Sequence, residues 1–449
     1  MDKEIVVIGG GPAGIEAARE AARLGIQVTM VSAGPVGGRA GWHSLLPSKV
    51  WLAAAETAQE VASVANPGAV SWGPQEILAR LGQVKQDWND QAQEELDALG
   101  VPVLRGTASF DSPDSIQVTD DGGNIAASFA KKPVIVASGS VPVFPPGLKP
   151  DGRLVIAPRL LSKLANLPSS ILVIGAGATG CESAYLFNAL GAAVTWIVDQ
   201  FGILPQFQQE AGAALGHALK RQGVQIIAGQ MVDTLERDED KVTAVLMNGE
   251  RHEADMAFVA VGRRADLGPL NLAAAGLEPE SSGRIEVDEY GRTANPLVYL
   301  AGDADGGIMT ANKAQAQGRI AVWHIAGAPV AAFDPGTLIM PVYTDPQVAQ
   351  IGDLRRGPGV ATKRISFKKS LKAHIMIEWD GFLELFYDEQ EGRILGAVAV
   401  GPHAADVLSP LAIAIQFKGQ IDELASIYAA YPSLSELPYI AAREANFTT

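Results

Sequence analysis

Two stretches of the chain share one pattern of apolar and polar positions. In residues 5–31 an apolar run leads into three closely spaced glycines, a helical pattern of apolar positions follows, and a second apolar run ends the stretch. The same order returns 166 residues later, in residues 171–197. A buried strand, a glycine turn, a helix and another strand predict a βαβ unit with parallel strands. The repeat therefore predicts an α/β fold built on two such units.

The glycines of both stretches follow the spacing G-x-G-x-x-G. They are Gly9, Gly11 and Gly14 in the first copy and Gly175, Gly177 and Gly180 in the second. The first glycine of such a motif allows a tight turn, the second leaves room for a pyrophosphate, and the third lets helix and strand pack closely. The pyrophosphate then lies on the amides of a helix N-terminus. Two copies in register predict two Rossmann-like dinucleotide-binding domains.

Two further segments are typical of a flavin-binding scaffold. Ala137 and Gly139 follow the apolar run 134–136, and Gly302 and Asp303 follow the β-rich run 293–301. An acid at the second position can accept hydrogen bonds from a polyol. A helical segment that includes Lys313 begins after residue 310.

With these segments the whole chain resembles the pyridine nucleotide-disulfide oxidoreductases, the family of dihydrolipoamide dehydrogenase, glutathione reductase, mercuric reductase and soluble transhydrogenase. Residues 34–38 and 46–49 resemble the segment that carries the family's redox-active disulfide, residues 343–349 resemble the opening of its interface domain, and 431–436 resemble its C-terminal motif. The resemblance implies FAD, NADH or NADPH, and a homodimer. It also implies an FAD domain at 1–145 and 256–330, an NAD(P) domain at 146–255, and an α+β dimerisation domain at 331–449.

The chain departs from the family at the disulfide. The positions of the two family cysteines fall on Ala40 and Leu45, and the position of the family's C-terminal histidine falls on Tyr431, although its supporting carboxylate is present as Glu436. The only cysteine, Cys181, lies inside the second glycine motif. Without a thiolate at residue 40 or 45, dithiol–disulfide exchange is the activity that the sequence most clearly rejects.

At most positions that surround the flavin in the family, this chain carries the family's residue. Lys49 and Glu182 match the family's Lys–Glu pair beside flavin N5, where a cation can stabilise the reduced ring. The acid expected after each glycine motif falls on Ser32 and on a valine, so Asp199, one residue later, is the candidate ribose acid of the second domain. No Arg or Lys lies between 195 and 210, which favours NADH over NADPH. Gly38, Gly262 and Lys313 complete the predicted cofactor contacts.

The segment 39–46 is expected to form a loop that faces the flavin on the side away from the nicotinamide. It is apolar and aromatic and contains one imidazole, His43. With Tyr431 from the partner subunit it predicts a site for a flat acceptor such as a quinone, and His43 or Tyr431 could supply a proton. The alternative is that His43 has no role in the reaction and is a surface or helix-capping histidine.

Composition and charge narrow the class of protein. The 449 residues suggest about three domains. A net charge of −15 argues against nucleic acid as a partner. One cysteine fits a reducing compartment. The start of the chain lacks the pattern of a secretory signal, and no apolar run approaches the roughly 18 residues of a membrane span. We expect a cytoplasmic protein without a metal site.

Three functions remain open from the sequence. The first is an FAD enzyme that takes hydride from NAD(P)H and reduces a non-disulfide acceptor, which could be a quinone-like molecule, a dinucleotide or a protein. The second is a flavoprotein that no longer turns over and serves as a structural or redox-sensing subunit of a larger complex. The third is a disulfide reductase that borrows thiols from a partner chain. The retained Lys49, Glu182 and Asp303 favour the first.

Overall fold

The repeated sequence pattern folds twice into the same unit. In the computed structural model, which describes residues 4–64, 73–377 and 380–446, β1 (Glu4–Ile8) and β2 (Gln27–Ser32) are parallel and are joined by α1 (Pro12–Arg23). In the second copy β10 (Ser170–Ile174) and β11 (Ala193–Val198) are parallel and are joined by α5 (Ala178–Ala189). Both first strands are almost wholly buried, as their continuous apolar sequence requires.

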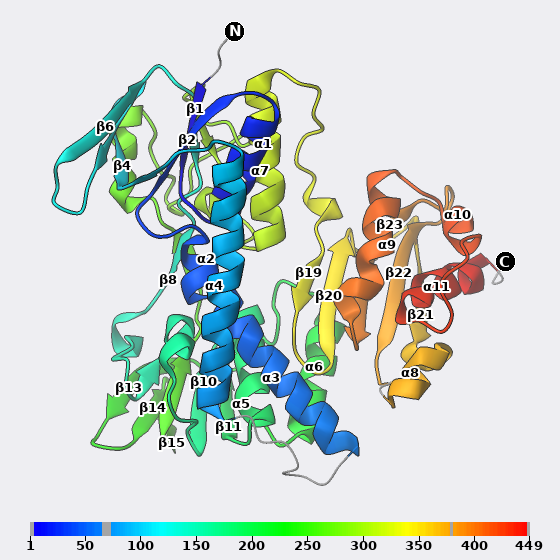
Figure 1. The fold of residues 1–449 in the computed structure, drawn as a ribbon. Helices are drawn as coiled ribbons and strands as arrows, with labels where there is room; N and C mark the ends of the chain where they lie inside the picture. The colour runs from blue at the N-terminus through cyan, green and yellow to red at the C-terminus, as the bar shows by residue number, and fades with distance from the viewer. Residues whose placement is uncertain (1–3, 65–72, 378–379, 447–449) are drawn as a thin grey trace.

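The first domain is a parallel sheet of order β18-β7-β1-β2-β3, seen at the upper left of Figure 1. Helices α1 and α7 (Ala311–Ala326) pack against each other beside it. An antiparallel sheet, β4-β5-β6, lies next to it. The remaining strands are β3 (Val103–Arg105), β4 (Thr107–Ser112), β5 (Ser115–Thr119), β6 (Ile125–Ala130), β7 (Val134–Val136) and β18 (Val298–Leu300). Residues 1–3 of the predicted FAD domain lie outside the described residues.

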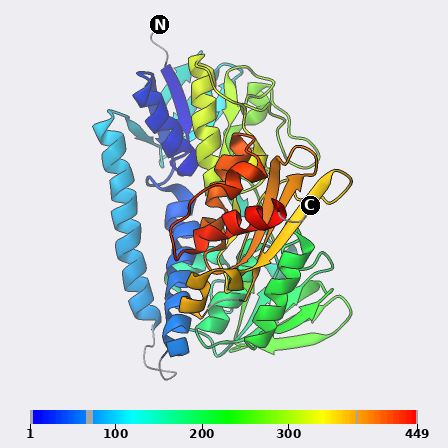
Figure 2. The same cartoon turned by 90° about the vertical axis from the view of Figure 1, so that its right-hand side faces the viewer.

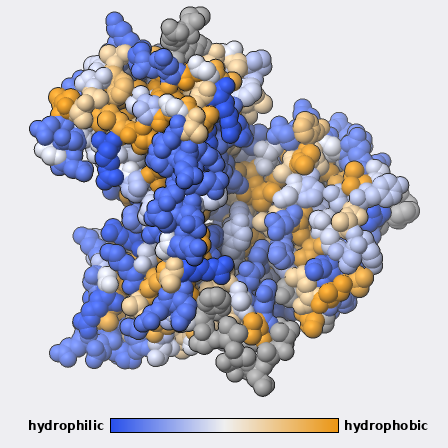
Figure 3. All heavy atoms as spheres, in the orientation of Figure 1, coloured by the Kyte–Doolittle hydropathy of each residue, from blue (hydrophilic) through white to orange (hydrophobic). Residues whose placement is uncertain are grey.

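Three consecutive helices between β2 and β3 of the first sheet extend toward the second domain. They are α2 (Gly38–His43), α3 (Leu45–Val64) and α4 (Pro74–Ala98). Helix α4 runs between the two domains in Figure 1, and its outward surface is hydrophilic in Figure 3. Helix α3 packs against α5, and the Trp51 indole donates a hydrogen bond to the Leu161 carbonyl (3.0 Å).

The second domain is a parallel sheet of order β12-β11-β10-β16-β9 with α6 (Gln209–Arg221) and an antiparallel sheet β13-β14-β15. The sequence placed the return to the FAD domain at residue 256, but β16 (Met256–Val259) pairs with β10, so this sheet continues to residue 259. The apolar run of β16 completes the buried sheet. The other strands are β9 (Val155–Ile156), β12 (Gln225–Ala228), β13 (Val232–Arg237), β14 (Val242–Leu246) and β15 (Arg251–Ala254). A ladder of β8 (Ser140–Pro142) and β17 (Arg263–Ala265) follows.

The third domain is an antiparallel sheet of order β19-β20-β23-β22-β21 covered by helices, which faces the viewer in Figure 2. Its strands are β19 (Met340–Val342), β20 (Gln347–Gly352), β21 (Val360–Ser366), β22 (Phe382–Asp388) and β23 (Ile394–Gly401). Its helices are α8 (Leu371–Met376), α9 (Ala404–Gln416), α10 (Ile421–Ala425) and α11 (Leu437–Asn446).

Short 3-10 helices occur in all three domains. They are η1 (Pro146–Leu148), η2 (Pro158–Lys163), η3 (Gly268–Leu270), η4 (Leu272–Ala275), η5 (Gly302–Asp305), η6 (Pro335–Thr337), η7 (Phe367–Lys369) and η8 (Leu434–Glu436). One hydrophobic core includes α3, α5, the second sheet and side chains of β20 and β23, so the second and third domains share packed interior. None of the helices in the described residues is long and apolar enough to cross a membrane.

Candidate functional site

A cavity of about 1130 Å³ lies where the three domains meet. Its walls come from the first glycine motif, α2, α3, the loop after β7, the start of α7, α5 and the segment after β19. Ligand pockets usually measure about 300–1,000 Å³, so this cavity has room for a cofactor and a second ligand. Many of the predicted site residues line this cavity.

The first glycine motif shapes one end of the cavity for a pyrophosphate. A Cβ atom on Gly11 would meet nothing within 4 Å, so the space in front of this helix N-terminus is open. A Cβ atom on Gly14 would collide with the Gly9 carbonyl oxygen, which fixes the close approach of helix and turn. Gly38 stacks on the same turn, since its Cβ would lie 2.8 Å from the Cα of Gly11. Open amides at a helix N-terminus are a favourable place for phosphate.

Two hydroxyl groups in the cavity wall lack partners. The side-chain oxygens of Ser138 and Thr310 are buried, and no other described residue provides a hydrogen-bond partner for them. A buried hydroxyl without a partner costs free energy, so such groups commonly await a ligand or water. Together with the open turn at Gly11, they fit a polar, elongated cofactor such as FAD. Ser32 is also buried, and its hydroxyl donates to the Gly34 carbonyl (2.8 Å).

Asp303, the predicted polyol acid, is held by side chains from the β8–β17 ladder. The Ser140 hydroxyl donates to its Oδ2 (2.5 Å), and Arg263 Nε in turn donates to the Ser140 hydroxyl (2.8 Å). Burial lowers the pKa of Arg263, and the charge of Asp303 opposes that shift. The chain of hydrogen bonds fixes the carboxylate at the cavity wall.

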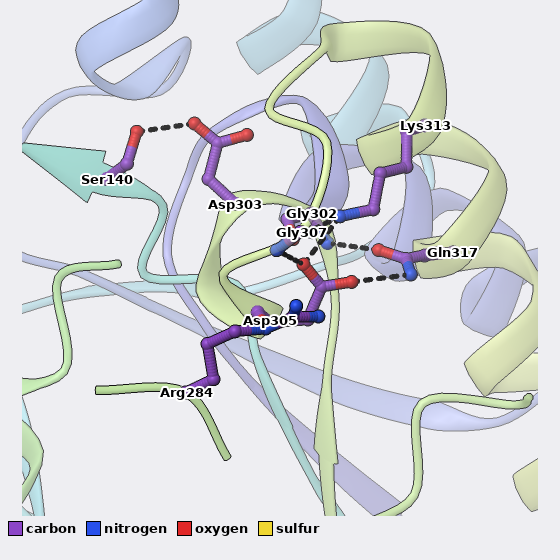
Figure 4. Close-up of polar contacts among 8 residues, drawn as sticks. All are labelled: Ser140, Arg284, Gly302, Asp303, Asp305, Gly307, Lys313 and Gln317. Carbon is purple, nitrogen blue, oxygen red and sulfur yellow. Dashed lines mark hydrogen bonds and ion pairs between the residues drawn. The ribbon is translucent and has the colours of Figure 1, made fainter. Parts of the chain in front are cut away.

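A second acid, Asp305, organises the turn that carries Asp303 (Figure 4). The Lys313 ammonium pairs with its Oδ1 (2.5 Å), and Gln317 donates to its Oδ2 (2.9 Å) while accepting from the Gly302 amide (2.8 Å). Lys313 is 3% exposed and does not line the cavity. Its predicted role as a cofactor contact stays a prediction; in the structure its ammonium fastens α7 to the turn that carries Asp303.

Lys49 and Glu182 meet in the cavity although 133 residues separate them. Their ion pair joins α3 of the first domain to α5 of the second at 2.6 Å. The same Glu182 oxygen accepts the Tyr343 amide (3.1 Å), and Lys49 Nζ lies 4.6 Å from the centroid of the Tyr343 ring. Burial and the Glu182 charge raise the pKa of the Tyr343 phenol. All three domains thus contribute to holding one cation.

The neighbouring part of the cavity wall is α2 and the first residue of α3, which we call the α2 wall (residues 39–45). It was predicted as a loop, whereas residues 38–43 are helical. Ala40 and Leu45 line the cavity, and so do Trp42, whose indole donates to the Val36 carbonyl (2.7 Å), and His43. Partial desolvation of the ring is the largest cause of a lowered pKa of His43, which is exposed as a whole residue, and the charges of Lys85 and Arg159 act in the same direction.

The only cysteine, Cys181, is not part of the cavity lining. Cys181 is fully buried within α5, its Sγ lies 3.5 Å from the Ala176 carbonyl oxygen, and burial raises its pKa well above the usual value. A buried, protonated thiol is a poor nucleophile. Cys181 belongs to the core rather than to the cavity.

Several predicted site residues lie outside the cavity of the single chain. Tyr431 is 72% exposed, and the Glu436 carboxylate is buried and accepts from the Ser370 hydroxyl (2.8 Å). Asp199 accepts the Phe201 amide (2.9 Å). The others are Gly14, Gly175, Gly177, Gly180 and Gly262. The cavity therefore gathers many, but not all, of the residues predicted for the flavin side, and Tyr431 lies outside it.

Sequence reasoning missed several cavity groups. Arg39 pairs with Asp266 (2.7 Å) and donates to the Ser138 carbonyl (2.6 Å), which links α2 to the loop after β7. Arg263 was also missed: the sequence analysis named the preceding residue, Gly262, as a cofactor contact instead. An arginine directly after a glycine was the available signal in both cases. No cluster of metal-ligating side chains occurs among the residues that the structure describes.

Comparison with known proteins gives one consistent result. The family "Pyridine nucleotide-disulphide oxidoreductase" matches residues 3–318, and its dimerisation domain matches residues 340–442. A dihydrolipoyl dehydrogenase from Halobacterium salinarum is 32% identical over 98% of this chain and 96% of its own. An NAD(P)H dehydrogenase (quinone) from Mycobacterium tuberculosis is 29% identical over 97% and 92%. The crystal structure of LpdA from Mycobacterium tuberculosis superimposes with a TM-score of 0.93 at 28% identity, covering 99% of both chains. These matches confirm the predicted fold class.

Proposed function

Because this chain belongs to the pyridine nucleotide-disulphide oxidoreductase family, whose members bind FAD and NAD(P)H, we propose that it is an FAD-dependent NAD(P)H:acceptor oxidoreductase whose acceptor is not a disulfide. When bound, FAD would supply the redox chemistry between NAD(P)H and a quinone-like acceptor. The chain offers no catalytic dithiol for this chemistry.

The observation that carries the proposal is the Lys49–Glu182 pair at the cavity wall. FAD, when bound, supplies the acceptor of a hydride and a donor of two electrons. Lys49 supplies a positive charge for the ring as it becomes anionic, and Glu182 keeps that ammonium in place at 2.6 Å. Asp303 and the unpartnered Ser138 and Thr310 hydroxyls supply polar contacts for the rest of the cofactor.

The α2 wall supports an acceptor other than a disulfide. Ala40 and Leu45 occupy the positions of the family's cysteines, and neither can form a thiolate. The indole of Trp42 and the Leu45 side chain offer apolar surface to a flat ring, and His43 lies beside them to donate a proton. One relative is named NAD(P)H dehydrogenase (quinone), which agrees with this acceptor class.

The remaining assignments follow from the same plan. We propose residues 1–145 with the segment after 259 up to 330 as the FAD domain, the intervening residues as the NAD(P) domain, and a homodimer through residues 331–449, which contain the matched dimerisation domain. NADH is the preferred donor, because residues 195–210 contain no Arg or Lys for a 2′-phosphate. The single cysteine favours a cytoplasmic location.

The test separates the two half-reactions. The purified FAD-loaded protein is mixed anaerobically with NADH or NADPH in a stopped-flow spectrometer, and the reduced protein is then mixed with 2-methyl-1,4-naphthoquinone. We expect the oxidised flavin band to bleach within one turnover and to return with the quinone. A protein that binds FAD but is bleached by neither dinucleotide would contradict the proposal and favour the flavoprotein subunit without turnover.

A further inference from the structure

One ion pair joins two parts of the cavity wall that are distant in the sequence. The Arg39 guanidinium, on α2, lies 2.7 Å from Asp266 Oδ2, which follows β17. The same guanidinium nitrogen donates to the Ser138 carbonyl (2.6 Å) in the loop after β7. All three residues line the cavity. We call the Arg39–Asp266 pair the latch.

Both ends of the latch are fixed at the backbone. Arg39 directly follows Gly38, which is pressed against the first glycine turn: a Cβ atom on Gly38 would lie 2.8 Å from the Gly11 Cα. At the other end the Asp266 amide donates to the Gly139 carbonyl (2.9 Å), next to the antiparallel ladder of β8 and β17. The Arg39 side chain therefore spans from the predicted pyrophosphate turn to the loop after β7.

A buried hydroxyl beside the latch indicates that a ligand occupies this part of the cavity. Arg39 bonds the Ser138 carbonyl, but the Ser138 hydroxyl is buried in the cavity wall and has no partner among the described residues. Such a group is commonly satisfied by a ligand or by water. Members of the family to which this chain belongs bind FAD, a polar and elongated ligand that fits this position.

We propose that the latch retains FAD. The Arg39–Asp266 pair holds α2 against the loop after β7 while FAD occupies the cavity, and it opens before the cofactor leaves. A helix of six residues has few internal hydrogen bonds, so the position of α2 depends on tertiary contacts of this kind. Arg39 is thus a positioning residue for the cofactor. The inference requires FAD binding and does not depend on the electron acceptor.

The test measures how fast bound FAD exchanges. The FAD-loaded protein is incubated with excess isotopically labelled FAD, and mass spectrometry of the cofactor released from the desalted protein gives the exchange rate. We expect the rate to rise about tenfold in Arg39→Met, which loses the ion pair and the bond to Ser138, and about threefold in Asp266→Asn, which loses the ion pair alone. The double variant should exchange no faster than Arg39→Met, because both changes break the same contact.

Two further measurements separate retention of the cofactor from stability of the fold. The matched control is Arg251→Met, which removes one cation of an exposed ion pair with Glu236 outside the cavity and should leave the exchange rate unchanged. The Tm of the apoprotein should be nearly equal in Arg39→Met and the wild type, whereas the rise in Tm on adding FAD should be smaller in Arg39→Met. High salt should speed exchange more in the wild type than in Arg39→Met, since the latch is partly exposed.

Three results would overturn the latch. The first is an unchanged exchange rate in Arg39→Met. The second is an unchanged rate in Asp266→Asn, which would assign the Arg39 guanidinium to the cofactor itself; this near-isosteric variant decides even where Arg39→Met fails to load FAD. The third is a double variant in which the two effects multiply, which would make the two side chains independent. None of these results concerns turnover, so rapid bleaching by NADH would still support the proposed function.

Discussion

The two walls of the central cavity are held in different ways. At one wall Glu182 is buried, and it bonds both the Lys49 ammonium and the Tyr343 amide, so that three domains fix a single cation. At the α2 wall Leu45 is 42% exposed, His43 is exposed, and a helix of six residues carries no sulfur atom. The Lys49–Glu182 wall, for which we propose hydride transfer, is held by paired polar groups, whereas the α2 wall is more exposed.

The difference shows which part of the chemistry depends on preorganised charge. Stabilising charge on a reduced ring requires a cation fixed before the reaction, and a buried carboxylate is costly unless it is paired. Accepting a flat apolar molecule requires only surface and access. We therefore expect substitutions at the Lys49–Glu182 wall to have large effects and substitutions at the α2 wall to have smaller ones.

The largest effect is expected from Lys49→Met. This change removes the cation and leaves the Glu182 charge buried without its partner. Reduction by NADH should slow by about 10²–10³-fold, the usual effect of losing one preorganised electrostatic group. Lys49→Arg, which keeps the charge, should slow it less. Stopped-flow absorbance of the flavin measures both, and equal rates in Lys49→Met and wild type would remove the functional distinction between the walls.

Asp303→Asn tests the cofactor wall rather than the reacting groups. The carboxylate accepts from Ser140 and would accept from the cofactor, and a hydrogen bond to a charged group contributes about 1.5–3 kcal/mol. The Kd of the apoprotein for FAD should therefore rise by about ten- to a hundredfold, measured by fluorescence quenching. Asp121→Asn, at an exposed turn between β5 and β6, is the control and should leave the Kd unchanged.

The variant His43→Gln tests the α2 wall through the pH dependence of protein stability. The folded state lowers the His43 pKa, so the unfolded chain binds more protons near pH 6. The wild type should therefore lose stability as the pH falls from 7.5 to 5, and His43→Gln should lose slightly less, with a Tm difference under about 2 °C. His217→Gln, on α6, is the control. A larger loss in His43→Gln would mean that the protonated imidazole is stabilised in the fold.

The smallest effect is expected from thiol chemistry. Cys181 is fully buried and its pKa is raised, so iodoacetamide should neither label nor inhibit the native protein before or after reduction by NADH. After unfolding in guanidinium, mass spectrometry should find one label per chain. Inactivation that follows labelling of the reduced native protein would contradict a dithiol-free mechanism.

The internal repeat was sufficient to predict the two parallel units, because strand, glycine turn and helix are local patterns. Asp303 could also be placed at the cofactor wall from its position after a buried strand. The Arg39–Asp266 pair could not be predicted, since it joins residues 227 positions apart whose approach depends on tertiary packing. The Lys313–Asp305 pair could not be predicted either: the two residues are close in sequence, but only the packing of α7 buries both.

The domain boundary after residue 255 could not be placed correctly from the sequence for a different reason. A four-residue apolar strand such as β16 has the same local pattern in either domain, and only its pairing with β10 assigns it to the second sheet. The segment 39–46 was predicted as a loop because it resembles the family segment that carries the redox-active disulfide. In the structure residues 38–43 form a helix that packs against α3 and α4.

Electron stoichiometry is the most direct test of the central claim, which is a flavin that works without a dithiol. The FAD-loaded protein is titrated anaerobically with NADH while its visible spectrum is recorded. We expect full bleaching at one NADH per flavin, without the long-wavelength band of a thiolate–flavin charge-transfer pair. Uptake of a second equivalent, or the appearance of that band, would reveal another redox centre and contradict the account.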